Sequence, residues 1–149
     1  MKEPVVVDST CLIGLEQIGR LDLLPNLFEP ICAPPEVQRE SGFFSEWLRI
    51  ETPANPDFIS ALKVMVDDGE AEAIALAVER NWKIVLDDRR ARDLAQRLGL
   101  KIIGTVGILV RAKRSGLLPW INPLLNELTE KGFHLSEDLK REALRMAGE

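Results

Sequence analysis

The strongest constraint on the fold is the alternation of short, uninterrupted apolar runs with longer segments of helical periodicity. The apolar runs are β-branched and too short for helices, so they predict buried strands. The expected strands are residues 4–7, 30–33, near 47–50, 83–86 and 101–103. The expected helices are residues 9–19, 21–28, 34–40, 58–66, 70–78, 89–98 and 105–114. This order predicts an α/β domain with a central parallel sheet and helices on both faces.

The length of 149 residues corresponds to one domain, and no linker or internal repeat divides the chain. Two further helical patterns, at 118–131 and 136–146, predict that residues from about 117 to 149 form a helical C-terminal extension. Its apolar side chains are expected to belong to the core, with an interface as the alternative. No uncharged run approaches the ~20 residues of a membrane span, and no signal peptide precedes the first strand. We therefore expect a cytoplasmic protein with no membrane partner and with two buried, reduced cysteines, Cys11 and Cys32.

Several classes of catalytic site are excluded by what the chain lacks. His134 is its single histidine, so a zinc site of paired histidines cannot form, and the cysteines do not have zinc-finger spacing. A Gly-rich phosphate loop and a Gly-x-Ser-x-Gly nucleophile elbow are also absent from the sequence. Carboxylates, in contrast, are abundant, and any catalysis is expected to depend on Asp and Glu.

Several carboxylates fall where an open α/β sheet places its functional groups, beyond the carboxyl ends of the strands. Asp8 ends the first expected strand, and Asp87 and Asp88 end the strand at 83–86. Three more acids complete the set: Glu40 ends the helix after the second strand, and Glu70 and Glu72 begin a later helix. Converging carboxylates repel one another unless a cation joins them, and all-oxygen ligands suit Mg²⁺ or Mn²⁺.

The charge is distributed unevenly along the chain. Residues 1–78 carry 5 basic and 14 acidic side chains, a net charge of −9, whereas residues 79–116 carry 10 basic and 4 acidic ones, a net charge of +6. Acidic groups that gather cations beside basic groups that bind phosphates would suit a metal-dependent enzyme acting on a polyanion. The simpler interpretation of each charge is a solvated helix face, and each acid of the set could instead cap or solvate a helix.

Taken together, five segments resemble the PIN domain family. They are residues 5–13 (VVVDSTCLI), 35–40 (PEVQRE), 69–77 (GEAEAIALA), 85–92 (VLDDRRAR) and 104–117 (GTVGILVRAKRSGL). The resemblance implies a Rossmann-like sheet with strand order 3-2-1-4-5 and Mg²⁺- or Mn²⁺-dependent cleavage of single-stranded RNA. Many members of the family are toxins of toxin–antitoxin pairs and are often dimeric. The partners it implies are therefore single-stranded RNA, an antitoxin protein and a second copy of the chain.

When the motifs of the family are matched to this sequence position by position, the resemblance implies which residues form the site. The implied catalytic acids are Asp8, Glu40, Glu72 and Asp88; Glu70 and Asp87 join them as implied metal ligands. Whether Glu70 or Glu72 is the third acid stays open. Implied substrate contacts are Ser9, Arg89 and Arg92, although Arg92 could pair with the acids instead. The chain departs from many toxins in having Glu as the third acid and Leu86 where those toxins have Thr.

The resulting prediction is a metal-dependent endoribonuclease, with two alternatives. The first is a non-catalytic PIN-like module that binds RNA or a protein and has lost productive metal geometry. The second is a phosphoacceptor domain in which Asp8 is phosphorylated. The latter fits less well, because Ser9-Thr10 replaces the Asp-x-Asp motif of haloacid dehalogenases, and Lys101 begins a strand where receiver domains have a lysine at the end of one.

Overall fold

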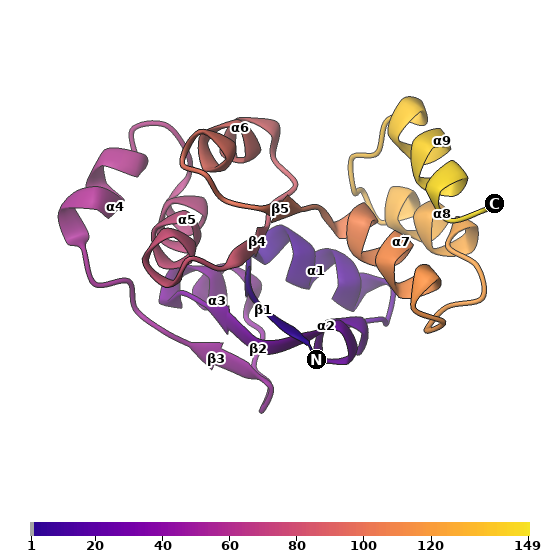
Figure 1. Ribbon diagram of the computed structural model, residues 1–149, viewed down its shortest axis with the longest axis horizontal. Helices are drawn as coiled ribbons and strands as arrows, with labels where there is room; N and C mark the ends of the chain where they lie inside the picture. Colours follow the sequence, from indigo (N-terminus) through magenta and orange to yellow (C-terminus); the bar gives the residue numbers. More distant parts are fainter. Residues whose placement is uncertain (1) are drawn as a thin grey trace.

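A five-stranded parallel sheet forms the centre of the protein in a computed structural model that describes residues 2–149 (Figure 1). Its strands are β1 (Glu3–Val7), β2 (Phe28–Ala33), β3 (Leu48–Ile50), β4 (Lys83–Val85) and β5 (Ile102–Ile103). They lie in the order β3-β2-β1-β4-β5, and every neighbouring pair is parallel. The predicted fold class and strand order are therefore confirmed, and the carboxyl ends of β1 and β4 are neighbours.

The helices surround this sheet. They are α1 (Ser9–Gln17), α2 (Leu23–Leu27), α3 (Pro35–Ser41), α4 (Pro56–Leu62), α5 (Asp68–Arg80), α6 (Arg89–Arg97), α7 (Thr105–Arg114), α8 (Asn122–Glu130) and α9 (Glu137–Met146). Helix α5 packs against β1 and β4, and α7 contacts α1 and α2. Helices α8 and α9, drawn in orange to yellow, gather beside α7 at one end of the molecule (Figure 1). They form the helical C-terminal segment that the sequence predicts.

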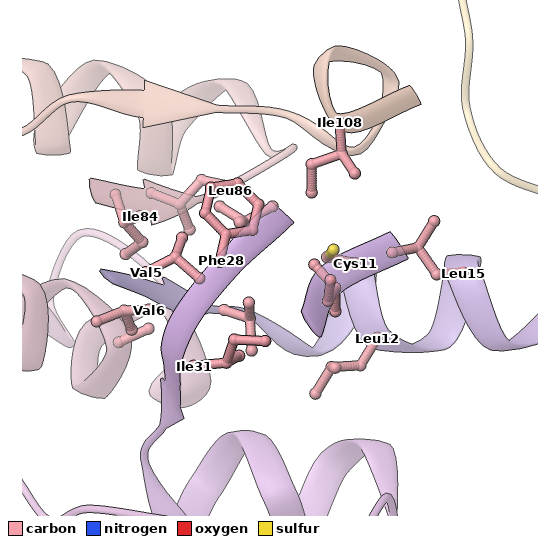
Figure 2. Packing of buried hydrophobic residues seen from close by; sticks show 14 of the residues in the cluster. Val5, Val6, Cys11, Leu12, Leu15, Phe28, Ile31, Ile84, Leu86 and Ile108 are labelled. Atoms are coloured by element: carbon pink, nitrogen blue, oxygen red, sulfur yellow. The ribbon is translucent and has the colours of Figure 1, made fainter. Parts of the chain in front are cut away.

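The core lies between the sheet and the helices that cover it. Val5 and Val6 of β1 and Ile84 of β4 are fully buried, as expected for central strands of a parallel sheet. Figure 2 shows their side chains close to those of β2 and to the buried face of α1. Val5 to Val7 pair in register with Lys83 to Val85, so the residues that follow the two strands leave the sheet at the same edge.

Several element boundaries differ from the expected ones. Helix α5 runs from Asp68 to Arg80 rather than from 70 to 78, and Phe28 belongs to β2 rather than to the helix before it. The largest differences are in α4 and α8. Helix α4 begins at Pro56 rather than 58, since the Asn55 side chain accepts a hydrogen bond from the Phe58 amide at 3.0 Å. It ends at Leu62 rather than 66, which leaves Val64 and Met65 exposed in the connection to α5. Helix α8 begins at Asn122 rather than 118, with a proline in its first turn, the position where proline is tolerated.

The apolar residues of the C-terminal segment are mainly core, as the sequence indicates. Ile121, Leu125 and Leu128 are buried, whereas Trp120 is exposed and lies under the Lys113 ammonium. Both cysteines are buried and unpaired. Among residues 2–149, no helix is both long enough and apolar enough to cross a lipid bilayer.

Candidate metal and phosphate site

Asp8 lies at the carboxyl end of β1 and is the most enclosed acid of the site. Its side chain is only 3% exposed, and its Oδ1 atom has no hydrogen-bond partner. The residue stands at the N-cap position of α1, yet its carboxylate makes no capping hydrogen bond. The capping role considered for Asp8 is therefore absent, and a buried polar atom is left without compensation, which is costly in a folded protein.

The surroundings of Asp8 oppose its negative charge. The pKa of Asp8 is raised to about 8, mainly by burial and in addition by the charges of Glu70, Asp67 and Glu40, while the Ser9 amide opposes the shift. A carboxylate in this environment gains stability either by taking up a proton or by binding a cation. The orphaned Oδ1 atom and the raised pKa together show that the Asp8 charge is poorly compensated within the protein.

The first turn of α5 supplies two more carboxylates through a capping box. Asp67 Oδ1 accepts a hydrogen bond from the Glu70 amide at 2.8 Å, and Glu70 Oε1 accepts one from the Asp67 amide at 3.2 Å. Glu70 is buried, and its pKa is raised to about 7, mainly by this burial and in addition by the charges of Asp67 and Asp88. Asp67 was not among the predicted site residues, although the Asp-x-x-Glu spacing of a capping box was present in the sequence.

Glu40, in the last turn of α3, reaches across to the same helix start. A Cβ atom added at Gly69 would lie 1.9 Å from Glu40 Oε1, so the missing side chain of Gly69 makes room for this carboxylate. Burial raises the pKa of Glu40, and Asp67 and Glu36 add to the effect, while a hydrogen bond from the Ser9 hydroxyl lowers it. Ser9, an implied substrate contact, is thus placed against an acid of the site.

Asp88 comes to the group from the neighbouring strand. It follows β4 and caps α6, because its Oδ2 atom accepts a hydrogen bond from the Ala91 amide at 3.0 Å. Its carboxylate lines a cavity together with Asp67 and Glu70. The helix-capping interpretation of Asp88 is therefore correct, and it coexists with a position in the candidate site.

Three further predicted residues, Glu72, Asp87 and Arg92, make contacts of another kind. Glu72 Oε1 accepts a hydrogen bond from the Glu36 amide at 3.4 Å, at the start of α3. Asp87 accepts from the Thr105 amide at 2.8 Å and from the Thr105 hydroxyl at 2.6 Å. Arg92 donates to the Leu86 carbonyl at 3.0 Å. The structure thus brings Asp8, Glu40, Glu70 and Asp88 together, with Asp67, and gives Glu72 and Asp87 structural partners.

A cleft of about 920 Å³ adjoins the site, although Asp8 and Glu40 are not among the residues that line it. Asp67, Glu70 and Asp88 lie on one part of its surface, and Arg89, Arg90 and Arg97 of α6 lie on another. Val64 and Met65, from the connection between α4 and α5, complete the rim. Acidic and basic groups therefore line one concave surface, the arrangement needed to hold a cation and a phosphate side by side.

The carboxylate oxygens of the site fit a hard divalent cation, although they do not already surround a single ion position. All the converging donors are carboxylate oxygens, the ligands that Mg²⁺ and Mn²⁺ prefer, and Asp8 Oδ1 has no other partner. Within residues 2–149, no three acidic, histidine or cysteine side chains already stand close enough to hold one ion. Binding would therefore require the carboxylates to draw together around the ion.

Two comparisons with known proteins bear on the family of the chain. A family model described as a PIN domain matches residues 4–149, which is nearly the whole chain. A search of curated proteins found no match.

Proposed function

The chain belongs to the PIN domain family, whose members are generally nucleases, and on this premise we propose that it is a metal-dependent endoribonuclease that hydrolyses single-stranded RNA. The observation that carries the proposal is the buried Asp8 carboxylate, whose Oδ1 atom lacks a partner while three other acids raise its pKa. A purely structural carboxylate would have its hydrogen bonds satisfied, as that of Asp87 does.

In this proposal Asp8, Glu40, Glu70 and Asp88 hold Mg²⁺ or Mn²⁺, and Asp67 supports Glu70 through the capping box. The chemistry supplied by such an ion is activation of water as a nucleophile and stabilisation of the leaving oxygen. The protein contributes a concave acidic surface that is partly shielded from water, where electrostatic interactions are stronger than in bulk solvent.

The arginines of α6 position the RNA in this proposal. Arg89, Arg90 and Arg97 line the cleft beside Glu70 and Asp88, so they bind phosphates of a strand while a neighbouring phosphate lies over these two acids. These side chains belong to the basic segment that the sequence singles out. An exposed single strand suits the cleft because its backbone is accessible from all sides.

The role in the cell follows from the family as a further part of the proposal. The protein acts in the cytoplasm as the toxin of a toxin–antitoxin pair, is neutralised by an antitoxin protein, and pairs with a second copy of itself. The alternative function is a non-catalytic module that binds RNA or a protein. The open arrangement of the carboxylates, in which no three already form a metal cage, favours this alternative.

The deciding experiment measures cleavage of an end-labelled single-stranded RNA with Mn²⁺ or Mg²⁺, and with EDTA as the metal-free control. Asp8→Asn removes the central ligand while keeping the side-chain shape, and Asp138→Asn, on the exposed first turn of α9, is its matched control. We expect the wild type and Asp138→Asn to cut the RNA and Asp8→Asn to lose at least about 100-fold in rate. Cleavage that survives EDTA or Asp8→Asn would refute the proposal.

A second readout separates the enzyme from the binding module. Mn²⁺ should raise the Tm of the wild type and of Asp138→Asn but not that of Asp8→Asn, because only a folded site binds the ion. A wild type that is folded, binds RNA and shows neither a Tm shift nor cleavage would establish the non-catalytic module.

A further inference from the structure

A second cavity, of about 570 Å³, lies beside the cleft and is not used by the proposed chemistry. It is bounded by α6, β5, the start of α7 and the connection between α8 and α9. Figure 1 shows these four parts of the chain, distant in sequence, around the β5 edge of the sheet. Its volume lies within the range of about 300–1,000 Å³ that is usual for small-molecule sites.

The cavity and the cleft adjoin one another at α6. Arg89 and Asp93 line both of them. Asp88 lines the cleft, and the residue before it, Asp87, lines the second cavity, so consecutive residues contribute to the two hollows. A strand that contacts Arg89 in the cleft can therefore continue into the second cavity.

The lining of the second cavity is mixed in a way that suits a nucleobase. Ile102, Ile103 and Val106 provide an apolar wall, and Phe133 and His134 provide two flat rings from one connection. Phe133 is half-buried, and its ring packs near Gly14. A Cβ atom added at Gly14 would lie 3.5 Å from Phe133 Cδ2, so contact with helix α1 limits the movement of the ring. Single-stranded nucleic acids bind proteins largely by stacking bases on such rings.

The polar side chains of the cavity fall into two groups. Asp87 accepts hydrogen bonds from Thr105, and Arg92 donates one to the Leu86 carbonyl. Arg89 and Asp93 line both the cavity and the cleft. A cation shared by the two hollows suits the phosphate of a nucleotide, and the apolar wall with its two rings suits the base, so this combination favours a nucleotide over a protein segment as the occupant.

We propose that this cavity is a base-binding subsite for the RNA nucleotide adjacent to the scissile phosphate, with Phe133 and His134 stacking on the base. The inference rests on the proposed ribonuclease function and deepens it, because a pocket for one base gives the cleavage reaction a means of selecting sequence. The single histidine of the chain, excluded as a zinc or triad residue, thereby acquires a role in substrate recognition.

The test measures binding of a fluorescein-labelled single-stranded RNA of about ten nucleotides by anisotropy, with Mg²⁺, in an Asp8→Asn parent that does not cleave. Phe133→Ala and His134→Ala remove the two rings; His134 is exposed, so its variant tests the subsite even where loss of Phe133 weakens folding. Phe44→Ala is the matched control, since Phe44 is an exposed aromatic that lies outside both hollows.

We expect each ring variant to lose about 5- to 100-fold in affinity, while Phe44→Ala binds like the parent. The slope of log affinity against log salt should stay unchanged in the ring variants and fall by about one phosphate contact in Arg89→Ala. If both ring variants bind RNA with the affinity of the parent, the base-binding subsite is refuted, and the cavity has another occupant such as a protein segment. The nuclease proposal would stand in that case. A parent that binds no RNA and a wild type that cleaves none would overturn both.

Discussion

The Glu40 carboxylate occupies the space that a side chain at Gly69 would need, because a Cβ atom there would lie 1.9 Å from Oε1. The contact joins the end of α3 to the first turn of α5, beside the capping box of Asp67 and Glu70. A helix start carries partial positive charge, so the close approach also suits an acidic group electrostatically. The position of one acid of the site thus depends on the absence of a side chain at another residue.

Gly69→Ala is expected to displace Glu40 without unfolding the protein, because the obstructing atom is the far end of a flexible side chain. We expect the affinity for Mn²⁺ to fall by about 10- to 100-fold, the usual effect of disturbing a group that positions a metal ligand. Titration calorimetry measures this. Gly14→Ala, in helix α1 where the added Cβ meets only ordinary contacts, is the control and should bind Mn²⁺ like the wild type. Equal affinities of the two variants would contradict the prediction.

Glu70→Gln and Glu72→Gln should differ in their rates of RNA cleavage, and this difference identifies the third acid of the site. Glu70 is buried among the acids around Asp8, whereas Glu72 accepts a hydrogen bond from the Glu36 amide. Glutamine preserves a capping box, so the fold should survive in both proteins. We expect Glu70→Gln to lose about 10- to 100-fold in RNA cleavage rate and Glu72→Gln to stay within about twofold of the wild type. The reverse order of rates would make Glu72 the ligand.

Without metal, stability should fall as the pH rises from about 4 to 8. The pKa of Asp8 is raised from 3.8 to about 8 and that of Glu70 to about 7, so the folded state holds protons that the unfolded state has released. The free energy of unfolding therefore decreases through this window. Asp8→Asn removes much of the effect and should stabilise the metal-free protein at pH 8 by about 1–3 kcal/mol, and by less at pH 5. Urea unfolding in EDTA at both pH values measures this; a stability that rises with pH would contradict it.

Substitutions of the two adjacent aspartates after β4, Asp87 and Asp88, should affect different properties: stability for Asp87 and cleavage for Asp88. Asp87 is bound by the amide and hydroxyl of Thr105, so Asp87→Ala leaves buried donors unpaired and should cost about 1–3 kcal/mol of unfolding free energy. Asp88→Asn keeps a side chain that caps helices well, so stability should change by less than about 0.5 kcal/mol while cleavage is lost. Thermal unfolding and cleavage rates of both variants provide the comparison. Equal losses of unfolding free energy in the two variants would contradict the assignment of a structural role to Asp87 and a functional role to Asp88.

The side chain of Glu149 caps the start of α8 from the far end of the chain. Its Oε2 atom accepts from the Ile121 amide at 2.7 Å and from Lys113 Nζ at 3.2 Å, and its Oε1 atom accepts from the Asn122 amide at 3.2 Å. We expect Glu149→Ala to cost about 1–2 kcal/mol, as the loss of a helix cap does, and to leave RNA cleavage unchanged. Glu142→Ala, an exposed acid of α9, is the control for loss of charge. A variant as stable as this control would contradict the capping role.

The fold could be predicted well from the sequence because its signals are local. β-branched runs and helical periodicity identify the strands and helices, and the resemblance to the PIN family supplied the strand order, which the structure confirms. Asp8 and Asp88 could also be placed, since a residue that ends a parallel strand lies at the carboxyl edge of the sheet wherever that strand sits. The largest boundary errors fell in α4 and α8; an asparagine cap sets the start of α4, and a proline lies in the first turn of α8.

The grouping of the other acids was decided by tertiary packing. Glu70 and Glu72 are two positions apart on one helix and point to different sides, so only the packing of α5 against α3 and β1 shows that Glu70 joins Asp8. Asp87 is taken out of the group by Thr105, 18 residues away in the chain. The sequence by itself determined the sheet and the acids at its edge, because strand and helix periodicity are properties of neighbouring residues. Which acids meet, and how closely, depends on contacts between segments distant in the chain, and only the tertiary structure decided that.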